Sequence, residues 1–192
     1  QAFYSEPGRA LDLPDAAVYI YPDSGRQRIV GVQLSYHLSQ TELEKRCAAL
    51  EDKVGELTAL LLPQTGDRQL LSAADQVLAQ GGYLPENGST AYQALLAGGA
   101  DSSGLALAMA LLCQELDVPC QVVWGELNGE IHFWNVVQTE TGYQHLDLSE
   151  IPAGEESFRS DLEQERLGYS WDSNQVPPCA LREGRAPAEE GA

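Results

Sequence analysis

The chain has 192 residues, the size of one ordinary domain, and 43% of them are hydrophobic, which is enough for a core and excludes wholesale disorder. Its 29 acidic and 11 basic residues give a net charge of −18, so the surface should repel phosphate backbones and anionic membranes. No stretch approaches the roughly 20 consecutive apolar residues that a membrane-spanning helix needs. We therefore expect no nucleic-acid partner and no direct insertion into a membrane.

The cysteines and histidines do not form a metal-binding pattern. The four cysteines are too few for a disulfide scaffold, and no two of them form a Cys-x-x-Cys pair. The three histidines do not cluster with them along the chain as zinc ligands usually do. These residues are Cys47, Cys113, Cys120, Cys179, His37, His132 and His145. The sequence therefore predicts neither a metal nor an organic cofactor.

The N-terminal region is predicted to be an arm followed by a hairpin. Residues 1–15 carry Pro and Gly without clear periodicity, which indicates an irregular arm. Two runs rich in β-branched and aromatic residues, 16–21 and 29–38, flank turn-forming residues and predict two paired strands. Because the chain begins at Gln1 and not at Met, we expect that a targeting segment has been removed and that the protein is extracellular or on the cell surface.

Two helices are predicted next. Apolar residues at spacings of three and four indicate a helix that begins at Ser39 or Thr41 and ends before Pro63. Cys47 lies on its apolar stripe, which favours a buried structural thiol. A shorter helix is predicted over 67–80, where two glycines follow.

The most informative region begins with a strongly apolar helix. The run at 102–116 is rich in Ala and Leu, with Asp101 or Ser102 placed to cap it, and a short apolar segment at 91–96 precedes it. Three strands are predicted to follow, at 120–126, 131–139 and 143–148. This order predicts an α+β domain in which a buried helix packs on an antiparallel sheet.

We expect one domain over 16–180. Its lead-in, the hairpin and first helix, covers 16–66, and its core covers 67–180. The acidic, Pro-rich C-terminal region is predicted to carry one helix around 158–167. Residues 181–192 are predicted to form a flexible acidic tail.

Three polar residues stand where the predicted elements could bring them together. Ser102 lies at the start of the apolar helix, where free backbone N–H groups and the helix dipole favour an anion. His132 and Asp147 lie on the second and third strands that follow, and antiparallel strands can place such side chains side by side. A hydroxyl, an imidazole and a carboxylate could then serve as nucleophile, base and orienting group.

The same residues also have simpler interpretations. Ser102 can be a helix cap, His132 a partly buried strand residue, and Asp147 a turn or surface carboxylate. The spacing alone leaves both interpretations open.

Longer motifs around these residues resemble the bacterial transglutaminase-like superfamily. The ordered motifs are AYQALLAGGADSSGLA at 91–106, HFWN at 132–135 and YQHLDLS at 143–149. The family's closing motif is similar to FRSD at 158–161, GYSWD at 168–172 and PPC at 177–179. This resemblance implies the papain-like fold of thiol enzymes, with the helix of the site packed on an antiparallel sheet and a hairpin and helices before it.

The resemblance also implies roles for individual residues. The family's nucleophilic cysteine falls on Ser102, while His132 and Asp147 match its general base and the carboxylate that orients that base. Further residues that would line the cleft are Tyr92, Trp134 and Asn135. Cys120 and Cys179 resemble cysteines found at equivalent places in the family. A disulfide between any pair of the four cysteines and buried free thiols both remain open.

The departure at Ser102 affects the chemistry most. A cysteine with a pKa of about 8.5 is readily made a thiolate at a helix N-terminus, whereas a serine depends on concerted proton removal by its base. Other positions differ too: Leu105 replaces a tyrosine of the pattern, Gln93 replaces a glycine, and Ala74 and Asp75 stand where the family often carries His-Asp. These additional differences favour natural loss of activity over an engineered change.

Three hypotheses follow for function. The first is a catalytically impaired domain that binds a protein or peptide in the cleft or has a structural role. The second is an active amide hydrolase or acyltransferase, a peptidase or transamidase, that uses Ser102, His132 and Asp147 as a triad. The third is a cysteine enzyme that carries an engineered Cys-to-Ser change. The oligomeric state cannot be derived from the sequence.

Overall fold

The computed structural model describes residues 6–8, 10–12, 14–21, 25–26, 28–150 and 157–181. Most of the predicted hairpin turn and nearly all of the predicted acidic tail therefore lie outside the described residues. Within the described part, no helix combines the length and the apolar character needed to cross a bilayer.

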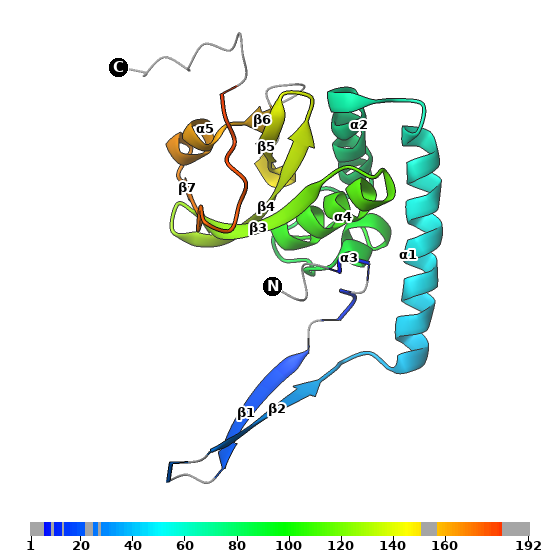
Figure 1. Cartoon of the computed structure of the whole chain (residues 1–192). Coiled ribbons are helices and arrows are strands. Elements are labelled where there is room, and N and C mark those ends of the chain that lie inside the picture. The colour runs from blue at the N-terminus through cyan, green and yellow to red at the C-terminus, as the bar shows by residue number, and fades with distance from the viewer. Residues whose placement is uncertain are drawn as a thin grey trace.

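The centre of the fold is a five-stranded antiparallel sheet with the strand order β6-β5-β4-β3-β7 (Figure 1). The three longest strands follow one another along the chain, and the two short outer strands come from the C-terminal segment. The strands are β3 (Cys120–Leu127), β4 (Glu130–Thr139), β5 (Gly142–Leu146), β6 (Phe158–Arg159) and β7 (Tyr169–Ser170). The predicted antiparallel meander is confirmed.

The helix α4 (Ser102–Glu115) packs against this sheet and forms the middle of the molecule (Figure 1). Its residues from Ser102 to Cys113 are all buried, as expected for a helix that is apolar on every side. Its other contacts are with α1 (Gln40–Leu61), α2 (Gly66–Ala79) and α3 (Ala91–Leu96). The predicted α+β arrangement, a buried helix on an antiparallel sheet, is therefore confirmed.

The long helix α1 follows from its cap and its apolar stripe. The Ser39 hydroxyl accepts the backbone N–H of Glu42 at 3.2 Å, and the helix ends two residues before Pro63. Cys47, which was expected to be buried, is half-buried. The fully buried residues of the stripe are Leu50, Val54, Leu57 and Leu61.

Apolar side chains pack on both faces of the sheet. The larger core lies between the sheet and the helices and includes Leu107, Met109 and Phe158. A smaller cluster on the opposite face contains Val123, Trp134, Val136, Tyr169 and Cys179. Since side chains alternate along a strand, His132 of β4 lies on the same face as this smaller cluster.

The hairpin of β1 (Asp15–Tyr21) and β2 (Ile29–Ser35) extends away from the sheet and helices (Figure 1). The large hydrophobic side chains of its described residues are all exposed. The second strand ends at Ser35 and not at 38, because the backbone N–H groups of His37 and Leu38 donate to the Asp12 carboxylate. That the hairpin and the core form one domain stays a prediction.

The helix predicted around 158–167 is shorter in the structure than the sequence indicated. Residues 158–159 form strand β6, and only Asp161–Arg166 are helical, as α5. The reason is a capping box, in which the Ser160 hydroxyl accepts the N–H of Glu163 and the Glu163 carboxylate accepts the N–H of Ser160. The cap starts the helix at 161 and leaves the two preceding residues free to pair with β5.

Candidate active site

Ser102 is the first residue of α4, and the residue before it is the cap. The Asp101 carboxylate accepts the backbone N–H of Gly104 at 2.9 Å and the hydroxyl of Ser103 at 2.7 Å. A Cβ on Gly104 would stand 2.5 Å from the Ala100 Cβ, so the glycine allows this helix end to pack closely on the preceding loop. The cap and the glycine together hold Ser102 at the N-terminus of a buried helix.

The Ser102 hydroxyl faces β4. It accepts a hydrogen bond from the backbone N–H of Phe133 at 3.3 Å, and only 9% of the residue is exposed. Phe133 directly follows His132 in β4, so this bond joins the N-terminus of α4 to the strand that carries the predicted base.

His132 and Asp147 form a buried pair. The imidazole Nε2 lies 2.7 Å from the Asp147 Oδ2, and both residues are more than nine-tenths buried. Asp147 does not lie on the third strand as expected. Strand β5 ends at Leu146, and Asp147 is the next residue, before the short 3-10 turn Leu148–Glu150.

Two residues without a predicted role complete the environment of Asp147. The backbone N–H and the hydroxyl of Ser149 donate to its Oδ1 at 2.8 and 2.7 Å. The hydroxyl of Tyr169 donates to its Oδ2 at 2.7 Å, and the Ser149 hydroxyl is also 3.1 Å from Nε2 of His132. Both residues lie within the motifs quoted above, but a hydroxyl has no periodic signal that would have assigned it to the site.

These contacts favour an ionised Asp147. Burial alone would raise its pKa, but the hydrogen bonds from His132, Ser149 and Tyr169 outweigh burial and hold the pKa below its usual value. Burial and the neighbouring Asp147 charge raise the pKa of Tyr169, so its hydroxyl remains a donor. An ionised carboxylate at Nε2 keeps the proton on that nitrogen and leaves the lone pair of a neutral imidazole on Nδ1.

Ser102 and His132 line the same pocket, which has a volume of about 360 Å³. Among the described contacts, no hydrogen bond joins the Ser102 hydroxyl to the His132 ring. Among the described residues, three acidic residues line this pocket and no lysine or arginine does. Its lining is Tyr83, Pro85, Asp101, Ser102, Leu127, Glu130, Ile131, His132, Phe133 and Glu150.

The three residues expected to line the cleft make other contacts. Trp134 is 1% exposed, and its ring stacks with that of His132 at a centroid distance of 6.4 Å. Asn135 is fully buried and donates to the carbonyl of Ala106 in α4 at 2.9 Å. Tyr92 packs under the guanidinium of Arg46, which lies 4.9 Å from its ring centroid. None of the three is in the lining of the Ser102 pocket.

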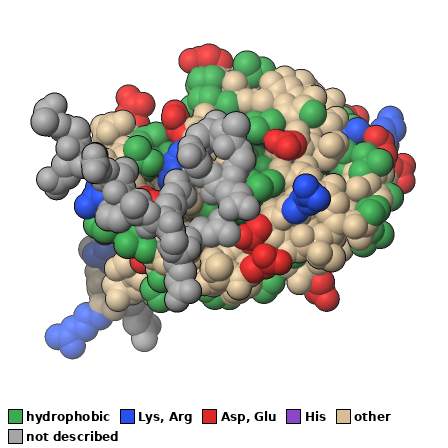
Figure 2. Space-filling view, turned by 90° about the horizontal axis from the view of Figure 1, so that it is seen from above, with side chains coloured by type: hydrophobic (Ala, Val, Ile, Leu, Met, Phe, Trp, Pro, Cys, Tyr) green, Lys and Arg blue, Asp and Glu red, His purple; other side chains and the backbone are tan. Residues whose placement is uncertain are grey.

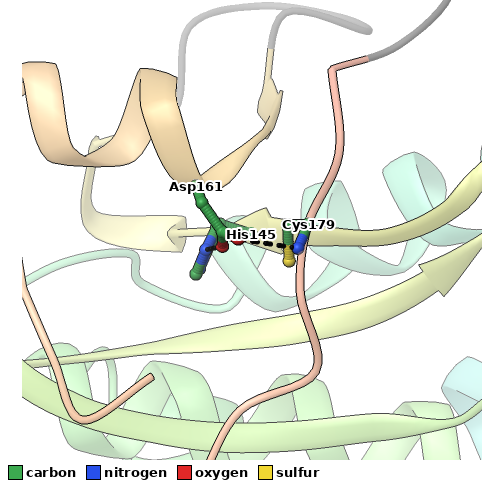
Figure 3. A group of neighbouring side chains, drawn as sticks. All are labelled: His145, Asp161 and Cys179. Atoms are coloured by element: carbon green, nitrogen blue, oxygen red, sulfur yellow. Dashed lines mark hydrogen bonds and ion pairs between the residues drawn. The ribbon is translucent and has the colours of Figure 1, made fainter. Parts of the chain in front are cut away.

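A second cluster lies beyond Trp134 and consists of His145, Asp161 and Cys179 (Figure 3). The Trp134 indole N–H donates to Nδ1 of His145 at 2.9 Å, and Nε2 of the same ring is 2.9 Å from the Asp161 Oδ1. The second oxygen of Asp161 accepts the backbone N–H of Cys179 at 3.0 Å. The sequence did not predict this group.

The ligand-capable atoms of this cluster lie within 4.8 Å of one another, but they do not fit a metal ion. An indole nitrogen is only a donor, so Nδ1 of His145 must accept, and Nε2 therefore carries the proton that points to Asp161. A metal at Nε2 would have to displace a proton from a ring that is already neutral. Burial and the Asp161 charge also raise the pKa of Cys179 to about 12, which keeps the thiol protonated.

All four cysteines are free thiols in the structure. A hydrogen bond with the Cys113 thiol and burial raise the pKa of Cys120 well above its usual value. Cys179 lies in the smaller cluster on the opposite face of the sheet. None of the disulfides that the sequence left open is therefore present.

Comparison with known proteins identifies the fold of the chain but not its family or its activity. No family model matches the sequence, and no curated protein matches it. A crystal structure of a TGase resembles 92% of this chain with a TM-score of 0.51 at 14% sequence identity, and this chain covers 54% of that structure. A candidate cysteine protease from Cytophaga hutchinsonii matches over 66% of this chain and 46% of its own, with 13% identity and a TM-score of 0.44. The chain thus spans about half the length of each of these two solved structures, and it has a transglutaminase-like fold.

Proposed function

We propose that this domain is a catalytically impaired transglutaminase-like module that binds protein or peptide ligands at the Ser102–His132 pocket. The observation that carries the proposal is the bonding of the Ser102 hydroxyl. Its oxygen accepts the Phe133 N–H, while His132 uses Nε2 for Asp147. A serine nucleophile needs a base within hydrogen-bond reach of its proton, and the described contacts do not include that bond.

The side-chain oxygen of Ser102 matters because a helix N-terminus beside a histidine suits a cysteine sulfur better than a serine oxygen. A helix N-terminus and an adjacent imidazolium stabilise a preformed thiolate, which needs no base at the moment of attack. A hydroxyl has almost no anionic population at neutral pH and gains little from the same surroundings. The pairing of His132 with Asp147 therefore supports a transglutaminase-like architecture without supporting turnover.

The charge of the pocket supports a basic ligand group. Asp101, Glu130 and Glu150 line it, and its volume of about 360 Å³ suits a side chain more than a folded surface. Acidic side chains also occur at several separate places on the face shown in Figure 2, in keeping with the net charge of −18. A lysine or arginine side chain of a protein or peptide is the ligand group that this lining favours.

Binding can be tested with short peptides. Acetyl-Gly-Lys-Gly-amide should shift the backbone NMR signals of Ser102, His132 and Phe133, and acetyl-Gly-Glu-Gly-amide should not. Glu130→Gln should weaken the lysine effect several-fold, whereas Glu51→Gln on the exposed side of α1 should leave it unchanged. Equal shifts by the two peptides, or none up to about 10 mM, would contradict a basic ligand at this pocket.

The second candidate, an active serine hydrolase or acyltransferase, is favoured by the 2.7 Å pairing of His132 with Asp147. A fluorophosphonate probe separates it from the first. We expect no labelling of Ser102 in the folded protein beyond that of the unfolded chain. Labelling that disappears in both Ser102→Ala and His132→Ala would overturn the proposal and support the triad.

A further inference from the structure

Strand β3 has an edge that is only partly covered. Its neighbour β7 pairs with Glu126 and Leu127 alone, through Ser170 and Tyr169. Residues 120–125 pair with β4 on one side, and no described strand pairs with them on the other. In an antiparallel ladder every second residue directs both its N–H and its C=O toward one side, so half of these six residues present both groups to the open edge.

A groove of about 930 Å³ runs along this edge. One wall comes from α4, with Ala110 and Gln114, and the other comes from the segment that follows β7, with Trp171 and Val176. The Nε2 of Gln121 donates to the carbonyl of Gln175 at 2.8 Å and holds that second wall beside β3. The edge therefore lies at the bottom of a two-walled groove and is not simply open to solvent.

The side chains of the groove are apolar and acidic. Two large hydrophobic side chains of the lining are exposed, Trp124 at 56% and Ile131 at 75%. Among the described residues, the charged ones in the lining are Glu126 and Asp172, and no lysine or arginine lines it. The side-chain amides of Asn174 and Gln175 donate to the Asp172 carboxylate, which lowers its pKa and keeps it charged.

We infer that this groove binds an extended polypeptide segment, with alternating apolar and basic side chains, which adds to the sheet as a strand beside residues 120–125. The free edge supplies main-chain hydrogen bonds, Trp124 and Ile131 offer apolar contact, and Glu126 and Asp172 favour lysine or arginine. β7 already pairs with the end of β3, so this edge accepts a strand in an antiparallel ladder.

The groove meets the Ser102 pocket at Ile131, which lines both. The inference builds on the proposed function in that the domain binds polypeptide, and it names the binding mode and a second surface. The two can fail separately, because Glu130 and Ser102 line only the pocket, while Trp124 and Asp172 line only the groove.

The first test uses a synthetic peptide, acetyl-VKVKVKV-amide, and its counterpart acetyl-VEVEVEV-amide, in calorimetric titrations of the full chain. We expect the lysine peptide to bind at least about tenfold more tightly than the glutamate peptide. Two N-methylated versions of the lysine peptide, one methylated on every valine and one on every lysine, test strand addition. In an extended strand, the N–H groups of the valines point to one edge and those of the lysines point to the other, so only one kind of residue can donate to β3. One methylated version should therefore lose binding and the other should keep it.

Variants place the site on the chain. Trp124→Ala should weaken the lysine peptide about fivefold or more, while Leu60→Ala, a change of a similarly exposed apolar residue on α1, should have no effect. Amide hydrogens at 120–125 should become protected from exchange when the peptide is added. Glu130→Gln should leave this binding unchanged, which separates the groove from the Ser102 pocket.

Several results would overturn the inference. They are no binding at about 1 mM peptide, equal binding of the two N-methylated versions, or binding insensitive to Trp124→Ala. Concentration-dependent dimerisation in sedimentation experiments that Trp124→Ala abolishes would also overturn it, because it would assign the groove to a second copy of this chain. If the lysine heptapeptide binds but acetyl-Gly-Lys-Gly-amide gives no response, the groove inference is supported and only the proposed ligand of the Ser102 pocket is contradicted.

Discussion

His132 and His145 lie on neighbouring strands, are both buried, and each pairs with an aspartate, yet their rings are used differently. His145 uses both nitrogens, one for the Trp134 indole and one for Asp161. His132 uses Nε2 for Asp147, and Nδ1 has no partner among the described contacts. The difference shows that a histidine–aspartate pair alone does not identify a base, because the nitrogen that remains available decides its role.

The two rings are joined through one tryptophan. Trp134 donates to His145 and stacks with His132, so the His145–Asp161 pair fixes the ring that lies behind the candidate base. We interpret His145 as a structural residue that supports the orientation of His132.

The largest effect is expected from His145→Ala. It leaves the buried Trp134 N–H without its acceptor and opens a cavity in the smaller cluster, so unfolding in urea should become easier by about 3–5 kcal/mol. His132→Ala, at the edge of the pocket, should cost only about 1–2 kcal/mol. Equal losses in the two variants would contradict the assignment of different roles.

A smaller effect is expected from Tyr169→Phe. The change removes the hydroxyl that donates to Asp147 at 2.7 Å and should lower the free energy of unfolding by about 1–2 kcal/mol. Tyr143→Phe is the matched control, since the described contacts include no hydrogen bond of its hydroxyl. If Tyr169→Phe is as stable as the control, then Asp147 does not depend on that hydroxyl.

The smallest effect is expected from pH. Burial lowers the pKa of His145 in the folded protein. At pH values between this lowered pKa and the unfolded pKa of about 6.5, the unfolded chain therefore binds more protons than the folded protein. The contribution of neutral His145 is therefore complete above about pH 6.5 and is lost as the pH falls toward the folded pKa. Thermal melts from pH 8 to 5 should show this decline in the wild type and less of it in His145→Gln. An unchanged slope in the variant would assign the decline to other groups.

The sequence was sufficient for the elements that have one dominant signal. The apolar run at 102–116 specified a buried helix, and the alternating strands after it specified the meander on which that helix packs. It was also sufficient to place Ser102, His132 and Asp147 in order, and the structure brings His132 and Asp147 into contact and Ser102 next to β4.

The element ends and side-chain positions that the sequence did not predict depend on local hydrogen bonds and on contacts between residues distant in the sequence. The capping box at Ser160 starts α5 at Asp161, so the helix is shorter than predicted. The Asp12 carboxylate accepts the N–H groups that would otherwise have extended β2. Trp134 and Asn135 were expected in the cleft, but both are packed inside, because each has a buried hydrogen-bond partner far away in the sequence. Tyr169 reaches Asp147 across 22 residues, which no local pattern signals.

We propose that the site keeps a base and a helix N-terminus suited to a thiol around a serine that does not use them. Ser102→Cys tests it most directly, with iodoacetamide labelling at about pH 6 and peptide mapping, and with the neighbouring Ser103→Cys as the control. We predict that the thiol at 102 reacts at least about tenfold faster than the one at 103 and than the four native cysteines, and that His132→Ala removes the advantage. Labelling at 102 that is no faster than at 103, or that does not depend on His132, would contradict this proposal.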